Sequence, residues 1–366
     1  MSYSCCSSNT GCCTTNTCNA GASCCCGTFD EPWVTGTLDT PVGSIPTIST
    51  RPTLADMLGA WKVRWGIGRM NYTIDPGLYA IGNPNADAPV LVGCDYKLSF
   101  DTLRKELRGL DCWLLILDTK GVNVWCASGK GTFGTDELVH RIEDSELAAV
   151  VSHKRLVLPQ LGASGVNGYE VKRRTGFDVS FGPVRACDIK EFISAGFNAT
   201  DEMRTVRFTA WDRLKLTPIE IVTAARHAVV VFGVLFIINL FAANPFDLSD
   251  FVALVGAALM GTFVTPLLLP YVPVKPFALK GEILGLIWTA ITALLFGWFS
   301  RATALLLIGY ILLLPAVSAW YAMNFTGSTT YTSPSGVQKE MKAALPFMAG
   351  ASLVGVVLVL INRIFD

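Results

Sequence analysis

The pattern of hydrophobic and polar positions changes its period near Pro218. Before this proline, short apolar runs alternate with amphipathic stretches. The expected strands are residues 90–93, 112–117, 147–152, 156–158 and 179–184. The expected helices are residues 54–63, 99–108, 136–143 and 188–195. Strands that alternate with helices predict a parallel, Rossmann-like sheet, in which ligands bind beyond the carboxyl ends of the strands.

Beyond Pro218 the chain is dominated by long apolar segments. A helix needs roughly 20 residues to cross the hydrocarbon core of a bilayer. Five segments are long enough: about 219–242, 251–269, 283–299, 302–323 and 343–361. The pattern therefore predicts an α/β Rossmann-like domain followed by an all-α membrane domain of five transmembrane helices. The expected boundaries are 29–200 for the α/β domain, 201–218 for a linker and 219–366 for the membrane domain.

Basic residues are distributed unevenly around the spans. Those on one side are Arg204, Arg207, Arg213, Lys215, Lys275, Lys280, Lys339 and Lys342. Because basic residues favour the cytoplasmic side, we expect a multi-pass protein of the cytoplasmic membrane, with the α/β domain in the cytoplasm and the C-terminus outside. The N-terminus lacks the pattern of a secretory signal. The polar segment 324–340 would also be cytoplasmic, either as an ordinary exposed connection or as a docking surface.

Composition adds one unusual feature, which is the placement of cysteine. Lys plus Arg equals Asp plus Glu, at 29 each, and no basic stripe indicates nucleic-acid binding. Eight of the twelve cysteines lie in the first 26 residues, in a segment too polar to repay the entropy of folding. Residues 1–28 are therefore expected to be a disordered tail. It is either a variable appendage or a binder of soft metals, in which adjacent thiols such as Cys24, Cys25 and Cys26 would hold Hg(II).

The stretch 119–134, TKGVNVWCASGKGTFG, carries the main candidate chemistry. Asn123 is placed to cap a short helix. Cys126 would then lie in the first turn, where unpaired N–H groups and the helix dipole favour a thiolate. Lys130, one turn later, adds a positive charge on the same face. A lone cysteine is more often a small buried hydrophobe, so the residues alone leave both interpretations open.

Other motifs in the chain are weaker. The remaining cysteines after the tail, Cys94, Cys112 and Cys187, lie in or beside apolar strands and are interpreted as buried. Residues 129–134 fit GxGxxG, but they begin about eleven residues after the strand, too late for a dinucleotide fingerprint. The three histidines, His140, His153 and His227, have no metal-ligand spacing, and no DxHxxG motif occurs. These patterns argue against a dinucleotide site and a histidine-ligated corrinoid.

The octapeptide from Asn123 to Lys130, NVWCASGK, resembles the cap-helix motif of the mercury-methylating corrinoid proteins, the HgcA family. Segments 75–79, 157–163, 181–186 and 324–336 are also similar, as is the plan of one α/β domain followed by five spans. The resemblance covers about residues 50–366. The family's corrinoid domain is in turn similar to that of the corrinoid iron–sulfur protein of acetyl-CoA metabolism.

The resemblance implies that Cys126 binds cobalt from the lower face of a base-off corrinoid. From residue type, Asn123 would cap the helix, Trp125 would pack beside the ring, and the small residues after Cys126 would let the helix approach the ring closely. The residues expected around the cofactor are Asn123, Val124, Trp125, Cys126, Ala127, Ser128, Gly129, Lys130, Pro159, Gln160, Leu161, Gly162, Ala163, Gly182, Pro183 and Val184.

The resemblance also implies an activity and partners. A ferredoxin-like protein, HgcB, with two 4Fe–4S clusters would supply electrons, and a folate one-carbon pathway would supply the methyl group. Hg(II) is an electrophile, so a methyl group that carries electron density is needed, and a thiolate trans to it would donate charge to cobalt. The expected activity is a corrinoid-dependent methyltransferase that forms methylmercury. The alternatives are a membrane-anchored corrinoid methyl carrier acting on another acceptor, and a soft-metal binding or transport protein.

Overall fold

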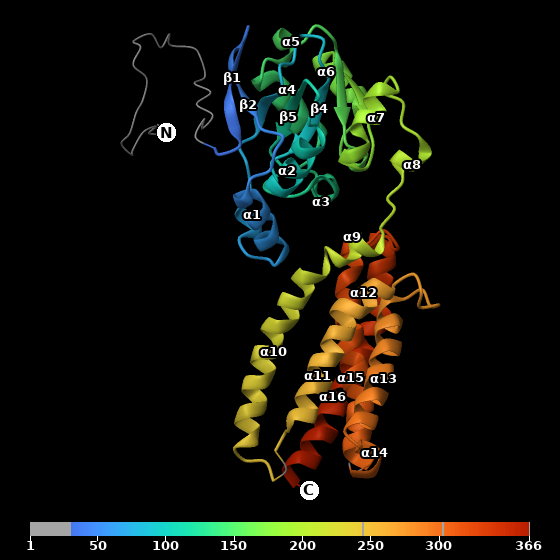
Figure 1. Ribbon diagram of the computed structural model, residues 1–366. Coiled ribbons are helices and arrows are strands. Elements are labelled where there is room, and N and C mark those ends of the chain that lie inside the picture. The colour runs from blue at the N-terminus through green and yellow to red at the C-terminus, as the bar shows by residue number, and fades with distance from the viewer. Residues whose placement is uncertain (1–30, 244, 302–303, 366) are drawn as a thin grey trace, which may run out of the picture.

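A β-sheet flanked by helices lies at one end of the molecule, and a bundle of long helices lies at the other (Figure 1). The computed structural model describes residues 31–243, 245–301 and 304–365. The expected metal ligands Cys24, Cys25 and Cys26 lie outside the described residues.

Among the described residues, one seven-stranded sheet has the order β1-β2-β3-β5-β4-β6-β7. Its strands are β1 (Val34–Thr40), β2 (Gly43–Ile48), β3 (Gly77–Ile81), β4 (Val90–Cys94), β5 (Cys112–Leu117), β6 (Arg155–Leu158) and β7 (Asp178–Phe181). The four strands β5, β4, β6 and β7 are parallel. β3 runs antiparallel to β5, and β1 and β2 form an antiparallel hairpin. The expected parallel sheet is thus correct for the centre and incomplete at the N-terminal side, where the sheet is mixed.

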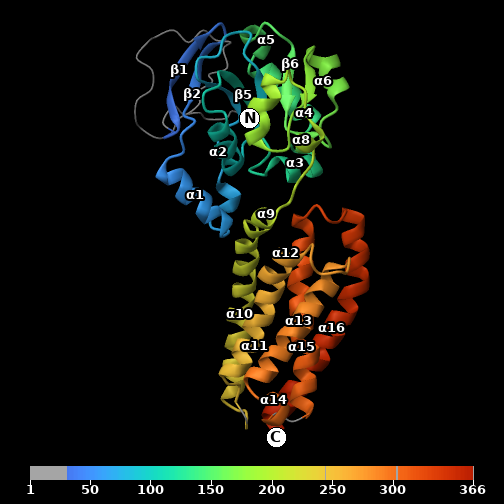
Figure 2. The same cartoon turned by 45° about the vertical axis from the view of Figure 1, so that its right-hand side comes forward.

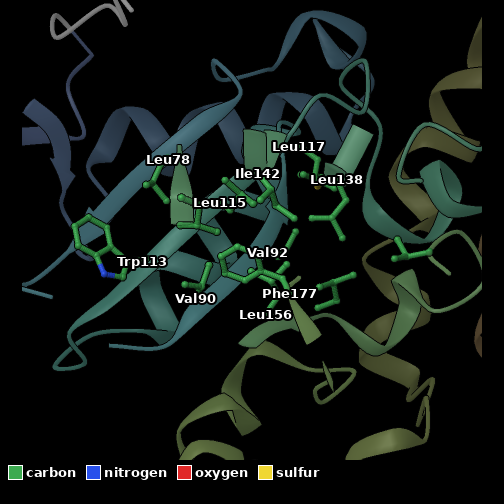
Figure 3. Close-up of a cluster of buried hydrophobic side chains, with 14 of the residues drawn as sticks. Leu78, Val90, Val92, Trp113, Leu115, Leu117, Leu138, Ile142, Leu156 and Phe177 are labelled. Atoms are coloured by element: carbon green, nitrogen blue, oxygen red, sulfur yellow. The ribbon is translucent and has the colours of Figure 1, made fainter. Parts of the chain in front are cut away.

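Helices cover both faces of the central strands. They are α1 (Leu54–Arg64), α2 (Lys97–Glu106), α3 (Val124–Lys130), α4 (Thr135–Asp144), α5 (Leu147–Val150), α6 (Gly168–Thr175) and α7 (Ile189–Ser194), with 3-10 turns η1 (Arg69–Asn71), η2 (Gln160–Gly162) and η3 (Ala186–Asp188). Every residue of β4 and β5 is buried. Alternate side chains of these strands enter two hydrophobic clusters. One cluster joins Leu115 and Val92 to Leu138 of α4 (Figure 3). Continuous apolar runs therefore form strands here because both faces must be buried.

One expected strand is wrong. Residues 147–152 were expected to be extended, whereas Leu147–Val150 forms α5. Leu147 and Val150 are buried, and the two alanines between them are exposed. One helical turn places residues three apart on one face, so it buries this pair more simply than a strand would.

The short helix α8 (Asp201–Arg204) lies beside the α/β domain, where Met203 joins its core (Figure 1). The helical bundle follows, with the elements α9 (Ala210–Leu214), α10 (Thr217–Asn239), α11 (Leu248–Leu259), the π-helix η4 (Met260–Val264), α12 (Thr265–Leu268), α13 (Phe277–Leu295), α14 (Trp298–Arg301), α15 (Ala304–Asn324), the 3-10 turn η5 (Phe325–Ser328) and α16 (Pro334–Phe365). In the described part of the chain, five helical segments are long and apolar enough to span a membrane, which confirms the expected number. They are Ala210–Asn239, Leu248–Leu268, Phe277–Leu295, Ala304–Gly327 and Ser335–Ile364.

Small residues set the spacing of the bundle. An added Cβ at Gly281 or Gly285 of α13 would lie 2.6 Å from atoms of α15. A Cβ at Gly309 of α15 would lie 2.7 Å from Val359 of α16. Such close approach supplies the van der Waals contact that holds helices together in lipid. The polar segment 324–340 is mostly helical: η5 and the start of α16 leave only residues 329–333 as a loop.

A buried ion cluster fixes α1 and α2 to the end of β2. Asp56 of α1 and Asp101 of α2 each bind both Lys97 and Arg104, at 2.6–2.8 Å. Arg104 is fully buried and also donates to the carbonyl of Ser49 at 2.6 Å. Although burial would raise the pKa of Asp56, hydrogen bonds from Lys97 and from Thr53 hold it well below its usual value. The Asp56 carboxylate is thus charged, and the two cations compensate its loss of water.

We expect Arg104→Met to lower the free energy of unfolding of the α/β domain by about 3–5 kcal/mol, because two buried carboxylates lose one of their cations. Denaturant unfolding of the full-length chain in detergent, followed by near-UV circular dichroism, measures this loss. Arg173→Met is the control, since Arg173 is largely exposed and pairs with Glu170, and it should leave the free energy of unfolding nearly unchanged. Equal losses in the two variants would contradict the role of the cluster.

Candidate functional site

Helix α3 presents the candidate thiol at the carboxyl edge of the sheet. The Asn123 side chain caps the helix by accepting a hydrogen bond from the backbone N–H of Cys126 at 2.9 Å, as the sequence predicted. Gly131 ends the helix in the left-handed conformation. Cys126 is exposed and forms no disulfide, and Trp125 beside it is also exposed. The interpretation of Cys126 as a buried hydrophobe is therefore excluded.

Asp95 holds the turn that leads into α3. This residue directly follows β4 and is buried. Its carboxylate accepts hydrogen bonds from the Thr119 hydroxyl at 2.5 Å and from the Gly121 N–H at 3.1 Å. Burial raises the pKa of Asp95, and these two hydrogen bonds oppose that rise. Sequence reasoning missed Asp95, and the available signal was an acidic residue placed immediately after a fully apolar strand.

Gly121 allows this turn to lie close to the neighbouring segment. Its φ of +69° favours glycine, and an added Cβ would lie 2.8 Å from Thr73 Cγ2. The turn therefore packs between Asp95 and residues 70–73, which places the start of α3.

The buried face of α3 packs against the loop after β6. Ala127 and Ser128 are buried, and the Ser128 hydroxyl donates to the carbonyl of Gly162 at 3.1 Å. An added Cβ at Gly165 would lie 2.8 Å from that hydroxyl oxygen. The small size of Ala127 and Ser128 thus serves contact with the protein. Gly129 and Lys130 are exposed, on the same side as Cys126.

Three loops meet at the switch point of the sheet. The connection after β4 runs to β5 on one side, and the connection after β5 crosses back to β6 on the other side of β4, so the crevice between β4 and β6 is where such sheets bind ligands. A cavity of about 120 Å³ lies there. Its lining includes the expected site residues Val124, Pro159, Gly182, Pro183 and Val184, together with Cys94. The loops are joined directly, because the Gly182 N–H donates to the carbonyl of Leu158 at 2.8 Å.

The same loops are bonded to the segment that enters the bundle. The Val184 N–H donates to the carbonyl of Met203 at 2.8 Å. Arg204 donates to the Gln160 side chain at 3.1 Å, and Arg185 pairs with Asp212 at 3.0 Å. Both views show α3 at the end of the α/β domain nearest the bundle (Figures 1 and 2). The candidate site therefore lies on the side of the α/β domain nearest the helical bundle.

The other described cysteines differ from Cys126. Cys94 and Cys112 are buried as expected, and burial raises the pKa of the first to about 11 and of the second to about 12. Cys187 was expected to be buried, but it is exposed in the turn η3, where its thiol donates to Asp188 at 3.3 Å. Burial and that carboxylate raise the pKa of Cys187. Within the described ranges, no group of three or more His, Cys, Asp or Glu side chains is arranged to hold a metal ion.

The segment of the chain that contains these loops is similar to a known protein family. Residues 68–193 match the CO dehydrogenase/acetyl-CoA synthase delta subunit family. This delta-subunit-like segment runs from the turn before β3 to α7 and includes all of α3.

Individual relatives agree with this match. The gamma subunit of the acetyl-CoA decarbonylase/synthase complex of Methanopyrus kandleri is 34% identical over 122 residues, which are 33% of this chain and 26% of the relative. That of Methanocaldococcus jannaschii is 31% identical over 127 residues, 34% of this chain and 26% of the relative. The chain spans about a quarter of the length of these curated relatives. The resemblance to a protein of acetyl-CoA metabolism is thus confirmed, whereas the delta-subunit-like segment does not single out the HgcA family.

We expect Asp95→Ala to loosen the start of α3 and to lower the free energy of unfolding by about 1–3 kcal/mol, because the Thr119 hydroxyl and the Gly121 N–H lose their acceptor. Hydrogen exchange of the amides at 119–126, read by mass spectrometry, should accelerate. Asp136→Ala is the control, since Asp136 is exposed on α4 and pairs with Arg174. Unchanged exchange at 119–126 in Asp95→Ala would refute the role given to Asp95.

Proposed function

We propose that this chain is a membrane-anchored, corrinoid-dependent methyltransferase in which the Cys126 thiol would hold the cobalt of the corrinoid and Hg(II) is the methyl acceptor. The observation that carries the proposal is the exposed thiol of Cys126 on α3, the helix whose first residue, Val124, lines the switch-point cavity. Support also comes from the match of residues 68–193 to an acetyl-CoA synthase subunit family and from the resemblance of the Asn123–Lys130 octapeptide to the HgcA motif.

The residues at the edge fit a corrinoid. A thiolate is a soft donor suited to a transition metal, and Cys126 is free to offer one. The cavity is too small for a whole ligand of this size, since ligand sites usually measure about 300–1,000 Å³. We therefore propose that the cavity takes one edge of the ligand and that the exposed surface of α3 carries the rest. A bound corrinoid supplies a methyl group held by cobalt.

The protein's own groups have separate roles in this proposal. The Cys126 thiolate donates electron density to the metal, which favours delivery to an electrophile such as Hg(II). Asn123 orients the thiol by holding the Cys126 N–H, and Asp95 positions the preceding turn. Trp125 offers an exposed aromatic surface beside the ring. The loops that contain Pro159, Gln160, Leu161, Gly162, Ala163, Gly182, Pro183 and Val184 shape the other side of the site.

Partners and orientation belong to the same proposal. We propose that the α/β domain is cytoplasmic, that a ferredoxin-like protein of the HgcB type supplies electrons, and that a folate one-carbon pathway supplies the methyl group. The multi-subunit complexes named for the relatives support an assembly with other proteins. The basic residues before α10 support the orientation.

Cys126→Ala is expected to abolish methylmercury formation and to change the visible absorption spectrum of the bound corrinoid, because the thiolate ligand is lost. The assay uses the full-length chain in detergent with a corrinoid, a reduced ferredoxin, a methyl donor and Hg(II). Cys187→Ala is the matched control, since Cys187 is also exposed and lies beside Asp188. Full activity and an unchanged spectrum in Cys126→Ala would refute the proposal.

A second candidate is a corrinoid methyl carrier that acts on another acceptor. It is favoured by the relatives, whose names refer to acetyl-CoA decarbonylase/synthase. The same assay separates the two, because a carrier of this kind would show the Cys126-dependent spectrum without forming methylmercury. It would then transfer the methyl group to another acceptor, such as an added thiol.

A further inference from the structure

Helix α1 exposes its apolar face and buries a charged residue, which is the reverse of an ordinary surface helix. Its apolar positions Leu54, Met57, Leu58 and Trp61 recur at i, i+3, i+4 and i+7, the spacing of a core-facing stripe. They are nevertheless exposed by 74%, 54%, 59% and 57%. The charged Asp56 faces inward, where the ion cluster of Lys97 and Arg104 holds it.

The apolar surface continues beyond α1. Ile67 and Met70 in the following turn are exposed by 57% and 70%. The ring of Trp65 lies 5.9 Å from that of Trp61. We call these side chains, together with the four residues of the stripe, the α1 patch: Leu54, Met57, Leu58, Trp61, Trp65, Ile67 and Met70. Large exposed groups of apolar side chains mark sites that bind a protein or a membrane.

The position of the α1 patch indicates what covers it. The turn after α1 touches the start of the first membrane span, since a Cβ at Gly66 would lie 3.8 Å from Ile219 Cγ1. Both views show α1 beside the upper end of α10, on the side of the α/β domain nearest the bundle (Figures 1 and 2). Helix α1 therefore lies close to the N-terminal end of α10, the first of the five helices long and apolar enough to span a membrane.

The chemistry of the surrounding residues fits a bilayer. Tryptophan is enriched at the boundary between lipid headgroups and hydrocarbon, because its ring is apolar and its N–H is polar. Lys62 is exposed at the edge of the stripe, and Arg64 and Arg69 lie close to it in the chain. Basic residues beside an apolar helix face favour anionic lipid headgroups.

We propose that the α1 patch inserts into the headgroup region of the bilayer and docks the α/β domain on the membrane surface. The domain is then held at two places, by its covalent link to α10 and by α1. This attachment does not depend on the chemistry of Cys126, so an experiment that contradicts it leaves the proposed function unaffected.

The test places the full-length chain in nanodiscs of phosphatidylcholine and phosphatidylglycerol, with and without brominated acyl chains that quench tryptophan. Trp61→Phe removes the emission of one patch residue, and Trp113→Phe removes that of a buried sheet residue. The difference in emission between the unsubstituted chain and Trp61→Phe reports on Trp61 and should be strongly quenched by bromine. The corresponding difference for Trp113→Phe reports on Trp113 and should not be quenched. Equal, weak quenching of both would overturn the proposal.

A second measurement introduces negative charges into the α1 patch, which should prevent its insertion into lipid. The double variant Leu58→Glu, Trp61→Glu should lose protection of Lys62 and Arg64 from trypsin in nanodiscs, whereas Ala55→Glu, exposed at the edge of the stripe, should keep it. Unchanged protection in the double variant would overturn the proposal. So would protection that appears only on adding a ferredoxin-like protein or on dimerisation, because the patch would then bind protein.

Discussion

Burial of β4 and β5 on both faces is the constraint on which the α/β domain depends. All eleven residues of β4 and β5 are buried, so helices must cover both faces of the sheet at these strands. Parallel strands with helical crossovers then deliver their following loops to one edge. The turn held by Asp95, helix α3 and the loops after β6 and β7 meet at that edge for this reason. The site is thus a product of how the core is covered.

The sequence was informative where one local signal decided the structure. The apolar runs of β4 and β5 and the cap at Asn123 could be predicted, because burial and capping are properties of a few neighbouring residues. The β1–β2 hairpin was missed, since its strands contain Gly36 and Pro46 and are only partly buried. Residues 147–150 fit a strand or a helical turn equally well by hydrophobicity, and only packing selects between them.

Long-range partners explain the remaining gaps. The role of Asp95 depends on Thr119, 24 residues later, and no short motif joins the two. The exposure of Cys187 depends on where η3 lies on the sheet edge, which its apolar neighbours do not reveal. The burial of Asp56, which leaves the apolar face of α1 exposed, depends on Lys97 and Arg104 of another helix. Sequence reasoning located the thiol and its helix, but it could not supply the contacts that position them.

The bonds between the site loops and the membrane entry have a mechanical consequence. Gln160, Val184 and Arg185 are the points at which the α/β domain is tied to residues 203–212. Two of these three ties use an arginine side chain, and the third joins two backbone groups. Because the ties end at or next to Pro159 and Val184, which line the switch-point cavity, a shift of the bundle relative to the α/β domain would act first on the walls of that cavity.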